Sequence, residues 1–266
     1  MLLSEVEYAR PQSVAEAVRL LGAHDGARAL AGGQTLINVM KARAASPDVL
    51  VDLIDLDELR QIRRTEKGLE LGAMVTYAQL MGSPEVGEGR PILAEVAAQI
   101  ADVQVRNRGT IGGNVCSSDP TNHYPPLLVA LGAEMTIAGA DGERTVPAEE
   151  FFLGVYMTAA GPGELLTRIV VPAGRRDGFA SLTIGADGTC IVNAAASLDR
   201  EPCVAIGCVS AVPVALHPAA PDEAAVREAV RGASLDPPSD VHGSAEYRRH
   251  LAEVLAVRAI EQAAGR

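Results

Sequence analysis

The chain has 266 residues, of which 48% are apolar and 21% charged, and its formal net charge is −11. These values are those of a soluble globular protein with one large domain or about two to three small ones. The negative charge argues against a nucleic-acid partner, which needs clustered Lys and Arg. No apolar run is long enough for a transmembrane helix, and the first residues lack the basic stretch of a signal peptide.

Residues 1–55 predict a small α/β unit, compact enough to be a lobe but not a stable domain alone. Ser13 and Glu16 form a capping box, and the apolar residues that follow recur at helical spacing. The other predicted elements are a strand over 28–31, a short helix over 35–40 and a strand over 49–53.

Residues 56–172 predict a second, larger unit of mixed strands and helices. Thr76 caps one helix, and Pro91 opens another, because proline is favoured at the first helical position. Asp141-Gly142 between apolar runs predicts a β-hairpin. The other predicted elements are a strand over 69–71, an extended or loop stretch over 105–110, a helix over 126–131, a strand over 165–171 and a linker over 172–174.

Residues 173–266 differ in pattern, because consecutive strands are followed by helices. Polar breaks at Asp187-Gly188 and over 199–202 predict an antiparallel meander. Strands followed by helices indicate an α+β domain with the helices on one face of the sheet. The predicted strands cover 179–184, 189–198, 203–210 and 212–216, and the predicted helices cover 222–230 and 245–264.

Two glycine pairs are the strongest functional signal in the chain. They lie in Ala31-Gly32-Gly33-Gln34-Thr35 and in Thr110-Ile111-Gly112-Gly113-Asn114. Glycine allows a positive φ and a close approach of the backbone to a ligand, and consecutive inward-facing amides form an anion site. Two such turns predict a diphosphate held from two sides, which makes a nucleotide cofactor the leading hypothesis.

The four cysteines lack the CxxC spacing and the neighbouring histidines of a zinc or iron–sulfur site. We therefore expect no metal to be bound by this chain. Cys203 and Cys208 lie in an apolar stretch, where a free thiol packs as a small hydrophobic group. Cys116 lies directly behind the second glycine pair, where it either lines a ligand pocket or fills space. A cytoplasmic location fits this cysteine usage.

Four segments carry a resemblance to a known family. They are the AGGQTL turn that ends at Leu36, the VRNRG stretch before TIGGN, the Phe151-Phe152-x-Gly154 segment before PGELL, and the final YRRHL helix. Through them the whole chain resembles the FAD-binding medium subunits of the molybdenum hydroxylases, the group of aerobic carbon monoxide dehydrogenase and xanthine dehydrogenase. R-N-x-G followed by TIGGN is the most specific of these motifs.

The resemblance implies an α+β fold with two N-terminal lobes that clamp FAD, of the PCMH or vanillyl-alcohol-oxidase type. These lobes would cover 1–55 and 56–172, and a smaller C-terminal domain would cover 173–266. It also implies an iron–sulfur small subunit with 2Fe–2S clusters and a molybdopterin large subunit, in a dimer of heterotrimers. Electrons would pass from molybdenum through the clusters to the flavin and on to an external acceptor, so no catalytic side chain is expected here.

The resemblance also implies which residues contact FAD. The segment from Ala31 to Thr35 should hold the pyrophosphate through backbone amides, with the Gln34 and Thr35 side chains assisting, and Leu36 is a further implied contact. The segment from Thr110 to Asn114 should hold the other side. The remaining implied cofactor contacts are Arg28, Cys116, Asp119, His123, Leu165 and Leu166.

Several of these contacts have structural alternatives. Arg28 either neutralises phosphate, packs near the adenosine or is a surface arginine. Asp119 lies where relatives place a polar residue near the ribityl or ribose. Leu165 and Leu166 lie where relatives pack a leucine near the flavin, and core packing is a strong competing explanation for both.

Two positions depart from the pattern of the relatives. His123 stands where many have an aspartate; it either touches FAD, and can then titrate near neutral pH, or is structural. In the C-terminal domain we place Phe179, Ser181 and Asp187-Gly188 where relatives carry an aromatic residue, a lysine and a Gly-Asp pair. Without that lysine, a cation near the flavin is missing, which would alter its potential or its acceptor.

Two other functions remain open at this point. A self-contained FAD-dependent oxidase or reductase would need its own substrate pocket, with a general acid or base facing the flavin. A scaffold that has lost its cofactor would not need the intact glycine segments. The substrate of the complex and its electron acceptor cannot be read from this chain.

Overall fold

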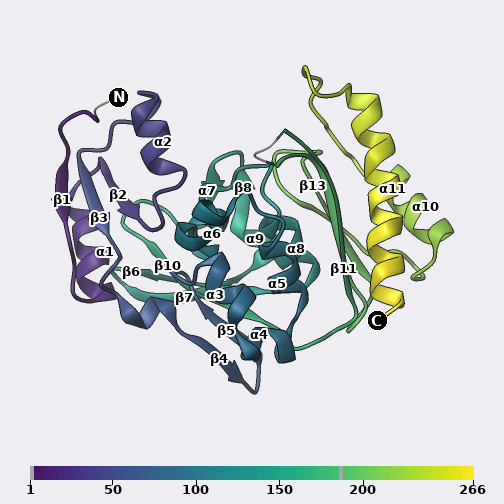
Figure 1. Ribbon diagram of the computed structural model, residues 1–266, viewed down its shortest axis with the longest axis horizontal. Coiled ribbons are helices and arrows are strands. Elements are labelled where there is room, and N and C mark those ends of the chain that lie inside the picture. Colours follow the sequence, from purple (N-terminus) through teal and green to yellow (C-terminus); the bar gives the residue numbers. More distant parts are fainter. Residues whose placement is uncertain (1–2, 186–187) are drawn as a thin grey trace.

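The structure is a computed structural model that describes residues 3–185 and 188–266 (Figure 1). Three main β-sheets divide the described chain into three regions, which follow one another from left to right in Figure 1. The α+β class predicted from the sequence is confirmed. Asp187, half of the predicted break between two strands, lies outside the described residues.

The first region is a three-stranded parallel sheet, in which β3 lies between β1 and β2. Ser13 caps α1 as predicted, because its hydroxyl accepts the amide of Glu16 at 3.2 Å. The carboxylate of Glu16 accepts the amide of Gln12 and not that of Ser13, so the capping box is only half formed. The elements are β1 (Glu7–Ala9), α1 (Val14–Ala23), β2 (Ala27–Leu30), α2 (Leu36–Lys41) and β3 (Val49–Asp52).

The second region is a five-stranded antiparallel sheet covered by short helices. Its strands, in sheet order, are β4 (Ile62–Thr65), β5 (Gly68–Gly72), β10 (Leu165–Val171), β6 (Glu134–Gly139) and β7 (Gly142–Pro147). Its helices are η1 (Asp57–Arg60), α3 (Tyr77–Gly82), α4 (Pro84–Gly89), α5 (Ile92–Ala97), α6 (Val103–Arg108), α7 (Ile111–Ser117), α8 (Tyr124–Ala130) and α9 (Ala148–Phe151). A two-stranded hairpin of β8 (Phe152–Gly154) and β9 (Met157–Thr158) stands apart from the main sheet.

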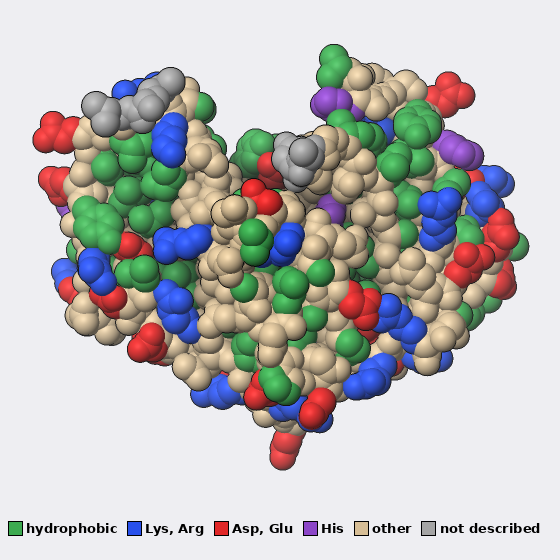
Figure 2. All heavy atoms as spheres, in the orientation of Figure 1, with side chains coloured by type: hydrophobic (Ala, Val, Ile, Leu, Met, Phe, Trp, Pro, Cys, Tyr) green, Lys and Arg blue, Asp and Glu red, His purple; other side chains and the backbone are tan. Residues whose placement is uncertain are grey.

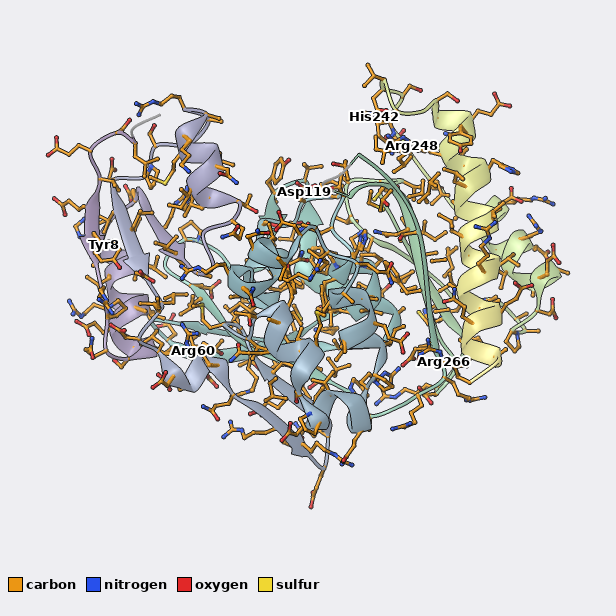
Figure 3. All side chains as sticks on the ribbon, in the orientation of Figure 1. Tyr8, Arg60, Asp119, His242, Arg248 and Arg266 are labelled. Carbon is orange, nitrogen blue, oxygen red and sulfur yellow. The ribbon has the colours of Figure 1, made fainter. Side chains whose placement is uncertain are left out.

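The third region is a four-stranded antiparallel meander with two helices. Ala194 and Ala196 of β12 pack in a core with α10 and α11, whereas Ala195 belongs to the core of the second region, so the sheet is covered on both faces. Arg248 fastens α11 to β12 by donating to the carbonyl of Ile191 at 2.6 Å (Figure 3). The elements are β11 (Asp177–Ile184), β12 (Thr189–Ser197), β13 (Cys203–Gly207), β14 (Val214–Leu216), α10 (Glu223–Gly232) and α11 (Ala245–Ala264).

Two predicted elements differ from the structure. The stretch over 105–110 is not extended, because α6 occupies 103–108 and is capped by Asp102, whose side chain accepts the amide of Val105 at 2.8 Å. The predicted strand over 203–210 ends at Gly207, where Cys208 takes a positive φ of 66° that breaks the ladder.

Candidate functional site

The two glycine segments come from different regions of the fold and meet at one place. A Cβ on Gly32 would overlap the carbonyl oxygen of Arg108, and a Cβ on Gly113 would lie 3.8 Å from the Cβ of Ala31. Figure 2 shows a broad notch in the upper outline of the molecule, between the first and third regions, and α7 lies below this notch in Figure 1. The fold thus brings the two segments together, as a ligand held from two sides requires.

The first segment is a turn that leaves a run of backbone amides free. Gly33 has a φ of +73°, which glycine adopts without strain, and α2 begins only at Leu36. The amides from Gly32 to Leu36 donate no hydrogen bond to any residue of the described chain. Gln34 braces the turn, because its Nε2 donates to the carbonyl of Gly32 at 3.2 Å. Consecutive unpaired amides of this kind form a concavity suited to an anion.

The second glycine pair lies in the first turn of α7, which corrects the prediction of a turn after an extended or loop stretch. The hydroxyl of Thr110 caps this helix and accepts the amide of Gly113 at 3.1 Å. The amides of Ile111 and Gly112 donate to backbone carbonyls within 73–75, each at 2.9 Å. These amides are therefore used inside the protein, contrary to the expectation that they hold a pyrophosphate.

The second segment instead offers an uncovered glycine and an unpaired oxygen. Gly113 is exposed, so a ligand can approach its backbone closely. Asn114 Oδ1 is buried and has no hydrogen-bond partner among the described residues. A buried oxygen without a donor is rare in native proteins and calls for a ligand or a water. A dinucleotide such as FAD needs amide donors for its diphosphate and hydrogen-bond acceptors for its hydroxyl groups. The free amides of the first segment and Asn114 Oδ1 provide both, so the residues present fit this cofactor.

Asn122 is a supporting residue that sequence reasoning missed. Its Nδ2 donates to the carbonyl of Asn114 and to the hydroxyl of Ser117, both at 3.0 Å, and so fixes the end of α7. Asparagine in a loop has no sequence signal that would reveal such a contact. Cys116, on the same helix, is a free and exposed thiol.

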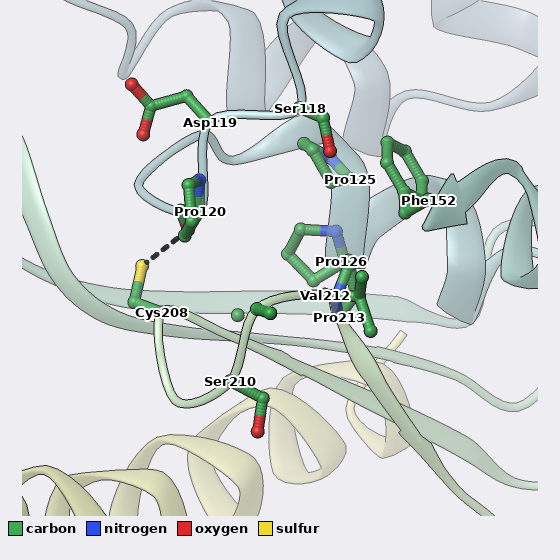
Figure 4. Close-up of a pocket in the computed structure, with 12 residues that line it drawn as sticks. Ser118, Asp119, Pro120, Pro125, Pro126, Phe152, Cys208, Ser210, Val212 and Pro213 are labelled. Carbon is green, nitrogen blue, oxygen red and sulfur yellow. Dashed lines mark hydrogen bonds between the residues drawn. The ribbon is translucent and has the colours of Figure 1, made fainter. Parts of the chain in front are cut away.

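Asp119 lies in the loop after α7, and its own loop engages its carboxylate. Oδ1 accepts the amide and the hydroxyl of Thr121 at 2.9 and 2.8 Å. The nearby cavity in Figure 4, between this loop and Cys208, has a volume of about 10 Å³. That is room for one water molecule, so this cavity is not the place of a cofactor.

His123 is buried where the second region meets the third. Its ring lies 5.2 Å from that of Phe179, and its Nδ1 lies 3.4 Å from Nδ2 of Asn193. On the same strand as Phe179, the hydroxyl of Ser181 lies 3.5 Å from Oε1 of Gln99. The contacts of His123 with Phe179 and Asn193 place its ring at the junction between the second and third regions.

For Arg28, Leu165 and Leu166, the surroundings match the structural alternatives, a surface arginine and two leucines packed in a core. Arg28 is exposed, and its guanidinium donates to the carbonyl of Ala27 at 2.8 Å. Leu165 is buried in the core of the first region and Leu166 in the core of the second. The structure therefore explains all three without a cofactor.

Replacing Gln34 with alanine tests the bracing of the first turn. We expect Gln34→Ala to weaken FAD binding by about threefold to tenfold, because one neutral hydrogen bond contributes about 0.5–1.5 kcal/mol and the free amides remain. Titration of the flavin-free protein with FAD measures this change. A loss beyond 100-fold would instead make the side chain a principal ligand.

No group of three or more His, Cys, Asp or Glu that could hold a metal ion occurs in the part of the chain that the structure describes. Within the same residues, no helix is long and apolar enough to cross a membrane.

The chain is similar to known proteins over its whole length. Residues 4–174 match the family described as the FAD binding domain in molybdopterin dehydrogenase, and residues 185–263 match the CO dehydrogenase flavoprotein C-terminal domain. The carbon monoxide dehydrogenase medium chain of Afipia carboxidovorans is 38% identical, over all of this chain and 99% of the relative. The nicotine 6-hydroxylase medium subunit of Paenarthrobacter nicotinovorans is 32% identical over the whole of both chains.

Solved structures are similar over the same extent. Reconstituted CO dehydrogenase from Oligotropha carboxidovorans matches with a TM-score of 0.93 at 36% identity, and all of both chains is covered. Quinoline 2-oxidoreductase from Pseudomonas putida matches with a TM-score of 0.90 at 32% identity, over all of this chain and 99% of the other. The chain therefore belongs to the family of FAD-binding medium subunits of the molybdopterin dehydrogenases, the molybdenum hydroxylases.

Proposed function

We propose that this chain is the FAD-carrying electron-transfer subunit of a molybdenum hydroxylase complex, which receives electrons from iron–sulfur clusters and passes them to an external acceptor. One observation carries the proposal: the free amides of Gly32 to Leu36 lie beside the uncovered face of Gly113. When bound, FAD supplies the redox chemistry, and the protein binds and orients it.

Within this proposal each segment has its own task. The amides of the first turn hold the diphosphate, and Gln34 keeps the turn in shape. Gly113 leaves room for the cofactor, and Asn114 Oδ1 accepts a hydrogen bond from a ribose or ribityl hydroxyl. In this arrangement the chain binds and orients the cofactor mainly through backbone amides and side-chain amide groups.

The proposal includes two partners, an iron–sulfur small subunit and a molybdopterin large subunit, in a cytoplasmic dimer of heterotrimers. The β8–β9 hairpin supports the presence of partners. Leu153, Val155, Tyr156 and Met157 are 57%, 48%, 68% and 58% exposed. The hairpin is held against the end of α7, because the amide of Tyr156 donates to the carbonyl of Ser118 at 3.0 Å. Large apolar side chains gathered at one exposed place are typical of a protein interface.

The double variant Leu153→Ser and Met157→Ser should reduce assembly with the other subunits about tenfold or more, because both side chains lose their apolar contacts. Its FAD content per chain should stay unchanged. Affinity purification through this chain, followed by the stoichiometry of the co-purified subunits, measures the effect. Met81→Ser, which changes an exposed methionine on α3, outside the hairpin, is the control. Full assembly of the double variant would rule out the hairpin as an interface.

The complete complex, purified through this chain, tests the proposed function. We expect a flavin absorption spectrum with about one FAD per chain, together with molybdenum and iron in the same particles. Flavin without the two metals would favour a self-contained flavoenzyme. Absence of flavin from the native assembly would overturn the cofactor assignment itself.

A further inference from the structure

The glycine segments leave the charge of a diphosphate uncompensated. A dinucleotide diphosphate carries negative charge, yet neither Ala31–Leu36 nor Thr110–Asn114 contains a cationic side chain, and the whole chain has a net charge of −11. Backbone amides contribute only partial charges. A site of this kind gains affinity from a nearby full positive charge, for which arginine is well suited because its fork of donors matches phosphate oxygens.

Three arginines lie close in sequence to the glycine segments, and two of them are engaged elsewhere. Arg28 donates to the carbonyl of Ala27 at 2.8 Å. Arg106 donates to two carbonyls in the loop before α6, at 2.8 and 2.7 Å. Arg108 is exposed, and its guanidinium forms no ion pair or hydrogen bond with any residue of the described chain. Only Arg108 among the three therefore has a free charge.

The backbone of Arg108 is held directly against the first glycine turn. A Cβ on Gly32 would overlap the Arg108 carbonyl oxygen and would lie 3.0 Å from the Cα of Gly109. Gly109 fixes this stretch, because its amide donates to the carbonyl of Val105 at 2.6 Å and its carbonyl accepts the amide of Tyr77 at 3.2 Å. The backbone of Arg108, from which its side chain extends, is thus held beside the free amides of the turn.

We propose that Arg108 is a cofactor-binding residue whose guanidinium neutralises the diphosphate held by the amides of Gly32 to Leu36. This inference rests on the proposed function, because it takes FAD as the ligand. The competing explanation is that Arg108, the last residue of α6, serves only as a cation at a helix C-terminus. That role would affect the stability of α6 but would not distinguish one flavin from another.

The test uses the full chain in its native assembly, from which flavin has been removed. FAD and riboflavin, which lacks phosphate, are titrated separately while flavin fluorescence is followed at low and at high salt. For Arg108→Gln we expect the Kd of FAD to rise about 10- to 100-fold at low salt, with no change in the Kd of riboflavin. The difference should shrink at about 1 M salt, where charge interactions are screened. Arg108→Lys should recover part of the loss.

Arg28→Gln is the matched control, since it removes the same charge from another exposed arginine near the turn. An equal loss of FAD affinity in Arg28→Gln would overturn the proposal, because the effect would then come from net charge alone. Unchanged FAD binding in Arg108→Gln, beside tight binding by the parent, would overturn it as well and leave the proposed function intact. A parent assembly that takes up no FAD would instead refute the proposed function, and this inference with it.

Discussion

In the Gly113→Val variant, we expect the FAD content of the purified protein to fall below about a tenth of that of the parent. Gly113 is exposed where the two glycine segments meet, and a Cβ added there would lie in van der Waals contact with the Cβ of Ala31, at 3.8 Å. The two methyl groups of valine would extend beyond this contact, cover the place where the segments meet and keep the cofactor away from the backbone. A steric block of this kind costs at least about 3 kcal/mol, or 100-fold in affinity.

The same substitution should leave the fold nearly intact. The added Cβ would lie 2.9 Å from the hydroxyl of Thr110, so the cap of α7 is strained by about 1 kcal/mol. Valine partly offsets this cost, because it favours a helix more than glycine does. Gly33→Val should lose FAD too, but its φ of +73° makes any branched residue strained, so that variant cannot separate binding from folding.

Gly87→Val is the matched control for Gly113→Val. Gly87 is also exposed and helical, in α4, and a Cβ added there would have no neighbouring atom within 4 Å. This variant should keep its full complement of flavin. Absorbance ratios of the purified proteins and thermal unfolding of their flavin-free forms measure both effects. A flavin content in Gly113→Val equal to that in Gly87→Val would refute the placement of FAD between the two segments.

Local signals in the sequence predicted much of the fold. Ser13 and Thr76 mark helix starts because a cap is made within a few residues, and the structure has both caps. The Asp141-Gly142 hairpin is present between β6 and β7 for the same reason. The α6 helix was missed, because an extended or loop stretch was expected there, although Asp102 three residues before Val105 is a cap signal.

The contact between the two glycine segments, and which of their amides are free, could not be predicted from the sequence. Whether the amides of Ile111 and Gly112 are free depends on the distant carbonyls of residues 73–75. The contact of Gly32 with Arg108 depends on how the first and second regions pack against each other. Both are tertiary contacts between segments with no shared sequence pattern. The sequence could therefore identify the two glycine segments, but not that the first has free amides while the second has an exposed glycine and an unpaired oxygen.

Removal of Arg90 should destabilise the protein more than removal of any exposed ion pair. Arg90 is 1% exposed and joins the second region to the third: its Nη2 lies 2.6 Å from Oδ1 of Asp177 and 2.9 Å from the hydroxyl of Ser197. Its Nη1 donates to the carbonyl of Pro172 at 2.9 Å. Arg90→Met would leave the carboxylate of Asp177 buried without a cation, which costs about 3–5 kcal/mol.

Urea denaturation of the purified chain measures this loss as a change in the free energy of unfolding. Arg64→Met is the matched control, because Arg64 also lies 2.6 Å from a carboxylate, that of Glu88, but both side chains are more than half exposed. Its loss should be below about 1 kcal/mol. The double variant Arg90→Met and Asp177→Asn should regain a large part of the stability, since no bare charge is then buried.

The pH dependence of the Arg90→Met variant separates charge from packing. Burial raises the pKa of Asp177, while Arg90 opposes this rise, so the pKa should rise further when Arg90 is absent. A carboxyl with a raised pKa in the folded state stabilises the fold below its unfolded pKa of about 3.9 and loses this contribution as the pH rises through the folded pKa. The difference in unfolding free energy between parent and variant should therefore narrow as the pH falls from neutral toward about 4. A difference that stays constant over this range would mean that Arg90 acts through packing alone, and that the charge of Asp177 does not determine the loss.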